Sequence, residues 1–170
     1  MKHLIFLLAV TLCNLNWLND TAAQMDNQQL LTIIEREAED VGGEIGAWHL
    51  SLDDHVLFIT TDEENNRIRI LTPIVEERDI DAEKMHKMLE ANFHSALDAK
   101  YSIYKGFVIS IFTHPLRELN EAQLIDAMHQ VIRLSETFGT TYSSTDILLD
   151  GQADDDEPDD RVKPATKKKS

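Results

Sequence analysis

Three segments with helical periodicity alternate with segments of strand periodicity, and this order most constrains the fold. Each helical segment follows a residue suited to cap a helix N-terminus, namely Asp26, Asp81 and Asn120. Apolar residues then recur three and four positions apart, until Gly42-Gly43 stops the first helix and Gly139 ends the third. The sequence therefore predicts three amphipathic helices.

The segments between these helices alternate apolar and polar residues, as expected of half-buried strands. Polar or glycine-containing turns separate them at 53–54, 62–66 and 105–106. The predicted strands are 48–52, 56–61, 67–72, 101–104 and 107–113. The element order is then αβββαββα, which is an α+β fold.

The ends of the chain differ from this central part. Lys2 and His3 precede an apolar run at 4–12, and small residues at 21–23 suit a signal peptidase. We therefore predict a cleaved signal peptide at 1–23, a folded domain at 24–149 and a disordered charged tail at 150–170. The expected location is periplasmic or secreted. The apolar run is shorter than the about 20 residues of a spanning helix, so no membrane span is expected.

Charge and cysteine content narrow the partners and the source of stability. The single cysteine, Cys13, leaves with the leader, so the remaining chain has no disulfide and depends on its core. The net charge is −15, and loss of the leader does not change it because Lys2 and Asp20 cancel. Such an acidic chain is a poor match for nucleic acid, whose binding needs clustered Lys and Arg.

We find no sequence signature of a catalytic, cofactor or metal site. No Gly-x-Ser-x-Gly elbow surrounds the serines, glycine-rich phosphate loops are missing, and no His-Glu-x-x-His pair occurs. A hydrolase site assembled in space from scattered His, Asp and Ser residues, such as Ser110 or Ser135, stays open as an alternative. His86 and His94 lie eight positions apart on the second predicted helix, but we interpret them as ordinary helix residues and not as metal ligands. We thus predict a protein that is not an enzyme and needs no cofactor.

The second helix carries the most informative apolar stripe. Met85, Met88, Leu89 and Phe93 lie on one side of it. Methionine adapts to irregular partners and is frequent on binding faces. The stripe is therefore either part of the core or a surface for a dimer or partner.

The element order, residues 89–93, the hairpin from Gly106 to Thr113, the sequence His114-Pro115-Leu116 and the closing helix together resemble the type III secretion chaperone-like superfamily. Proteins like the Tir chaperone are the nearest named relatives within it. The resemblance covers residues 26–142 and is strongest from Leu89 onward. It implies a curved antiparallel sheet flanked by helices, a homodimer, and a bacterial protein that holds an extended segment of a partner without catalysis.

The resemblance also implies roles for particular residues. It places Met85, Met88, Leu89 and Phe93 on the central helix near the dimer interface. It places four further residues in the first helix and strand that bind the partner: Leu30, Ile34, Trp48 and Leu50.

The predicted leader departs from the family pattern, because secretion chaperones act in the cytosol. The superfamily also contains proteins described as regulators of sensory transduction. An envelope regulatory or structural protein without a client is therefore an alternative to a chaperone.

Overall fold

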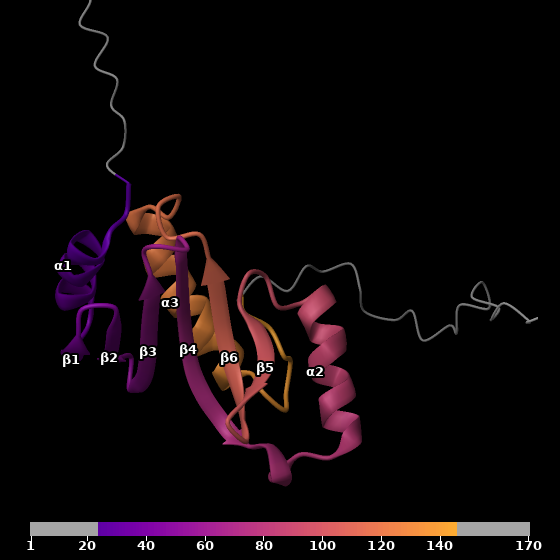
Figure 1. Cartoon of the computed structure of the whole chain (residues 1–170). Coiled ribbons are helices and arrows are strands. Elements are labelled where there is room, and N and C mark those ends of the chain that lie inside the picture. The colour runs from indigo at the N-terminus through magenta and orange to yellow at the C-terminus, as the bar shows by residue number, and fades with distance from the viewer. Residues whose placement is uncertain (1–23, 146–170) are drawn as a thin grey trace, which may run out of the picture.

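The structure, a computed structural model, describes residues 24–145, so the predicted leader, the whole predicted tail at 150–170 and the last four residues of the predicted domain lie outside the described residues. The element order is αββββαββα (Figure 1). The helices are α1 (Asn27–Glu37), α2 (Ala82–His94) and α3 (Glu121–Glu136), with a 3₁₀ turn at Glu77–Asp79. The strands are β1 (Asp40–Glu44), β2 (Ala47–Leu52), β3 (His55–Asp62), β4 (Arg67–Glu76), β5 (Lys100–Tyr104) and β6 (Phe107–His114). The predicted α+β class is confirmed, with one strand more than expected.

The extra strand, β1, replaces the last turn that we predicted for the first helix. Helix α1 ends at Glu37, and Val41 with Gly42-Gly43 continues as a strand that pairs with β2. Gly43 has a φ of +109°, and a Cβ there would collide with the carbonyl oxygen of Ala47. The two glycines therefore permit β1 to approach β2 closely as a paired strand, where we had expected only the end of a helix.

The six strands form one antiparallel sheet in the order β1-β2-β3-β4-β6-β5. Two-residue turns join β1 to β2, β2 to β3 and β5 to β6. A bulge between Pro73 and Val75 interrupts the β4–β6 register, since proline cannot donate to the ladder. Strands β1 and β5 are the two edges of the sheet.

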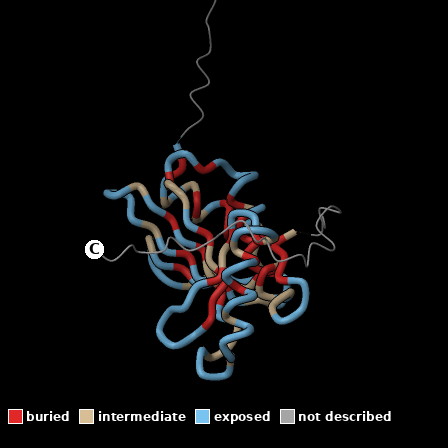
Figure 2. Tube along the Cα trace, turned by 90° about the vertical axis from the view of Figure 1, so that its right-hand side faces the viewer, coloured by how far each residue is buried: buried red, intermediate tan, exposed pale blue. Residues whose placement is uncertain are grey.

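One face of the sheet packs against α1 and α3 and forms the core. Alternate residues of β2, β3 and β4 point into it, for example Trp48, Leu57 and Ile70. Buried residues from α1 and from α3 belong to this same cluster, and Arg36 of α1 bonds to Glu121 of α3 at 2.8 Å. Figure 2 shows the buried segments gathered inside, with exposed turns around them.

Tyr101 joins β5 to the end of α3. Its hydroxyl donates a hydrogen bond to the carbonyl oxygen of Leu134 at 2.7 Å, and its ring makes edge contacts with Phe138 and Tyr142. Burial raises the pKa of the Tyr101 phenol well above its ordinary value. The phenol thus stays a neutral donor across the physiological range.

A substitution on β2 tests this one-sided burial. Leu50 is 1% exposed, so Leu50→Ala is expected to lower the free energy of unfolding by about 2–5 kcal/mol. His49 is the matched control, because it neighbours Leu50 on the strand and is exposed. His49→Ala is expected to change it by less than about 0.5 kcal/mol. Urea unfolding followed by circular dichroism measures both, and equal losses would contradict the packing.

Candidate partner-binding surfaces

Helix α2 lies beside the edge strand β5, outside the layer formed by the sheet with α1 and α3 (Figure 1). Its N-terminus is capped by Asp81, whose carboxylate accepts from the amide of Lys84 at 2.8 Å. Only Met88 and Ala91 of the helix are buried. Most of its surface is therefore exposed in the monomer.

The predicted stripe of α2 divides into an inner and an outer part. Met88 is buried and Met85 is half-buried, so these two face the rest of the domain. Leu89 is 63% exposed and Phe93 is 84% exposed. They are four residues apart and hence neighbours on the outer side of the helix. Leu97, just beyond the helix, is exposed as well. These three residues form what we term the outer stripe.

Polar contacts hold α2 against β5. The Asn92 side chain accepts from the amide of Tyr101 at 2.7 Å and donates to the Tyr101 carbonyl oxygen at 3.1 Å. Asn92 therefore pairs with the strand edge as another strand would. Lys100 Nζ donates to the carbonyl oxygens of Asn92 and Ala96, each at 2.7 Å, which stabilises the C-terminal end of the helix.

The other predicted partner residues lie in the core. Leu30 and Ile34 of α1 are fully buried, and Trp48 and Leu50 of β2 are 4% and 1% exposed. Each packs between the sheet and the helices. A direct role in partner binding stays a prediction for these four residues, and in the folded monomer they lie beneath the surface.

The face of the sheet away from α1 and α3 carries an apolar groove that the sequence analysis did not single out. Phe58, Leu71 and Ile111 lie in one row across β3, β4 and β6, and Pro73 pairs with Ile109 in the next row. The groove has a volume of about 780 Å³. Its lining is Phe58, Thr60, Arg69, Leu71, Pro73, Ser102, Ile103, Tyr104, Lys105, Phe107, Ile109 and Ile111. The nearly continuous apolar run of β6 was the available signal, since both faces of that strand are apolar.

Two cations lie on this mainly apolar groove. Arg69 belongs to β4, and Lys105 occupies the β5–β6 turn with its ammonium 5.1 Å from the centre of the Tyr104 ring. Within residues 24–145 neither forms an ion pair, although the charge of Arg69 contributes to the lowered pKa of Asp62, which is caused mainly by hydrogen bonds from Asn65. The groove is thus a basic and apolar patch on an acidic protein.

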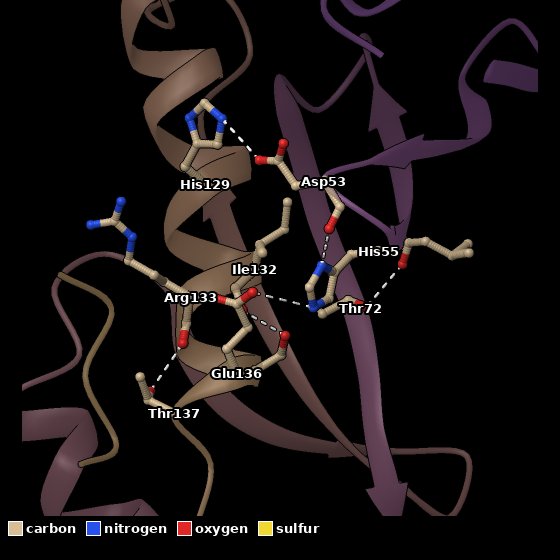
Figure 3. Close-up of polar contacts among 10 residues, drawn as sticks. Asp53, His55, Thr72, His129, Ile132, Arg133, Glu136 and Thr137 are labelled. Atoms are coloured by element: carbon tan, nitrogen blue, oxygen red, sulfur yellow. Dashed lines mark hydrogen bonds and ion pairs between the residues drawn. The ribbon is translucent and has the colours of Figure 1, made fainter. Parts of the chain in front are cut away.

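Scattered histidines do meet carboxylates, but at the opposite side of the sheet. His129 of α3 lies 3.6 Å from Asp53 in the β2–β3 turn, and His55 lies 3.8 Å from Glu136 (Figure 3). His55 also donates to the carbonyl oxygen of Asp53 at 2.6 Å. These contacts tie the turn to α3.

The two serines considered for a hydrolase site are not joined to these histidines. The Ser135 hydroxyl donates to the carbonyl oxygen of Ile132, and the buried Ser110 hydroxyl has no hydrogen-bond partner among the described residues. Between residues 24 and 145, no group of three or more His, Cys, Asp or Glu side chains is placed to hold a metal ion. In the same part of the chain, no helix is both long and apolar enough to span a membrane.

Comparison with solved structures identifies the fold as that of type III secretion chaperones. The structure of the HopA1–SchA chaperone–effector complex matches with a TM-score of 0.53 and 14% sequence identity, over 65% of this chain and 91% of the matched chain. The Yersinia pestis type III secretion chaperone SycH, in complex with a stable fragment of YscM2, matches with a TM-score of 0.51 and 13% identity. That match covers 66% of this chain and 98% of the other.

The resemblance recognised in the sequence is confirmed at the level of the fold. No protein-family model matches the sequence, and no curated protein matches it. The likeness thus rests on the three-dimensional arrangement, because identities of 13% and 14% leave few shared side chains.

The Asn92 clamp gives a testable consequence. Asn92→Ala removes two hydrogen bonds to Tyr101, so the amide of Tyr101 is expected to exchange faster and the domain to lose about 1–3 kcal/mol of stability. Asn92→Asp, the matched control, keeps the acceptor but loses the donor. Its exchange rate at Tyr101 and its stability should lie between those of the wild type and of Asn92→Ala. Hydrogen exchange followed by NMR measures the effect. Unchanged protection of Tyr101 in the alanine variant would contradict the clamp.

Proposed function

We propose that this chain is a non-enzymatic, chaperone-like module that forms a homodimer and holds an extended segment of a partner protein. The support is its fold, shared with a chaperone in a chaperone–effector complex and with a chaperone bound to a fragment of YscM2. The exposed apolar surface of α2 adds a second argument, independent of those relatives.

The outer stripe of α2 is the proposed dimer surface, and its exposure is the observation that carries the proposal. Phe93 at 84% and Leu89 at 63% are the most exposed large apolar side chains of the helices in the described chain. A twofold axis beside α2 would bring this patch against the same patch of a second copy. Met85 and Met88 support the helix from its inner side. Burial of the stripe would remove a patch that a stable monomer seldom leaves in water.

The edge strand β1 is the proposed partner site. One edge of β1 lacks a neighbouring strand within the described residues, and an extended segment can add there by main-chain hydrogen bonds. Ile45, in the turn after β1, is 69% exposed and offers an apolar anchor. Leu30, Ile34, Trp48 and Leu50 would support this surface from within the core.

The predicted leader places this function in the periplasm or outside the cell, which is part of the proposal. The alternative of an envelope regulator or structural protein without a client predicts the same location. Only the presence of a bound partner separates the two.

The dimer surface is tested by the double substitution Leu89→Ser with Phe93→Ser. Full burial of each side chain contributes about 1.5–3 kcal/mol, so losing both from both copies is expected to convert the dimer to a monomer at micromolar concentration. The fold should remain, because both positions are exposed. Light scattering after size-exclusion chromatography gives the mass. Lys84→Ser with Glu90→Ser, two exposed polar positions of the same helix, is the matched control. A wild-type monomer at every concentration would refute this dimer.

The partner is tested by crosslinking in intact host cells, followed by cell fractionation and mass spectrometry. We expect one reproducible protein partner, in the envelope or secreted fraction. Its crosslinks should lie near β1, and Val41→Pro should reduce them, because proline at an edge removes a donor. His49→Ala, on the adjacent strand, is the control. Self-crosslinks alone would favour a protein without a client.

A further inference from the structure

The groove on the open face of the sheet leaves apolar side chains exposed in the monomer, so we expect another chain segment to cover it. It combines apolar side chains of four strands with two cations, Arg69 and Lys105. Phe58, Tyr104 and Phe107 are each between 41% and 51% exposed on it. A contiguous apolar surface of this kind marks a binding site on a soluble protein. The apolar lining favours an apolar occupant, and the two cations favour one that also carries acidic groups.

We propose that the occupant is the chain's own segment 146–156, which continues directly from the described domain. Ile147, Leu148 and Leu149 form its apolar part. Asp150 and the acidic run that begins at Asp154 follow. The segment thus has the two properties that the groove selects, and its acidic residues complement Arg69 and Lys105.

The point where the described chain ends favours this contact. The amide of Ser144 donates to the carbonyl oxygen of Ser95, and the Ser144 hydroxyl accepts from the amide of Leu97. These bonds fix the chain beside the start of β5, at the edge of the sheet that borders the groove.

The segment is long enough to reach the groove. An extended chain covers at most about 3.3–3.6 Å per residue, so residues 147–149 lie up to roughly 7–14 Å beyond Thr145. Leu97, which bonds to Ser144, precedes Ser102 of the groove lining by five residues, and five extended residues span at most about 17–18 Å. The stretch of β4 from Arg69 to Glu76 spans roughly 23 Å, a length that the following acidic residues can cover.

Tethering favours this segment over a second copy of the chain. A short linker gives its own segment an effective concentration on the order of millimolar, far above that of a second molecule in a dilute solution. The segment therefore occupies the groove in each protomer, separately from the outer stripe on α2. This inference does not depend on the proposed dimer or partner, since a single protomer contains both halves of the contact.

Paramagnetic labelling of the full chain tests the contact. A nitroxide is attached at Ala153→Cys in a chain with Cys13→Ser, and methyl NMR spectra are recorded with the label oxidised and reduced. We expect line broadening of Leu71, Ile109 and Ile111. The broadening should be lost when Ile147, Leu148 and Leu149 are changed to serine.

Charge variants and a mixing experiment complete the test. Arg69→Gln with Lys105→Asn should weaken the broadening, and asparagine tolerates the positive φ of 50° at position 105. Serine at Lys167, Lys168 and Lys169 is the matched control and should leave it unchanged. Broadening of the Leu89 and Leu97 methyls of the outer stripe in place of the groove residues would overturn the proposal, as would no broadening at all. Broadening that arises only between spin-labelled and isotope-labelled copies would assign the groove to a second copy instead.

Discussion

Burial of one face of the sheet is the constraint on which the rest of the structure depends. Alternate side chains of β2, β3, β4 and β6 enter a single cluster with α1 and α3. Because α1 and α3 cover the same face, no helix within residues 24–145 covers the other face. Helix α2 lies instead at the β5 edge, where Asn92 and Lys100 attach it by hydrogen bonds in place of a large apolar contact. The exposed stripe of α2 and the open groove are both consequences of this arrangement.

The arrangement separates three surfaces that could each bind a chain. The edge of β1 offers main-chain hydrogen bonds, the outer stripe offers Leu89 and Phe93, and the groove offers apolar side chains with Arg69 and Lys105. The last differs in charge from the rest of the protein, whose net charge is −15. Different surfaces can thus serve different occupants at the same time, which suits a protein proposed to dimerise and to hold a partner.

Local sequence patterns predicted most of the fold because helix caps and turns depend on interactions between residues close together in the sequence. The three capping residues each accept a main-chain amide hydrogen bond at the start of a helix: Asp26, Asp81 and Asn120. The error at β1 has an equally physical cause. Gly42-Gly43 stops a helix in most sequences, and only pairing with β2 makes it a strand, because the tight approach to Ala47 leaves no room for a Cβ.

The sequence by itself determined which segments are helices and strands, apart from β1, as well as the charge balance and the resemblance to secretion chaperones. Tertiary structure decided which apolar residues are covered. Leu50 and Phe58 belong to equally apolar strands, yet one is 1% exposed and the other 41%. Met88 and Leu89 are consecutive residues of one helix, yet Met88 is 3% exposed and Leu89 is 63% exposed. The reason is that periodicity defines the faces of an element, whereas only the packing of the elements determines which face meets another and which is left open.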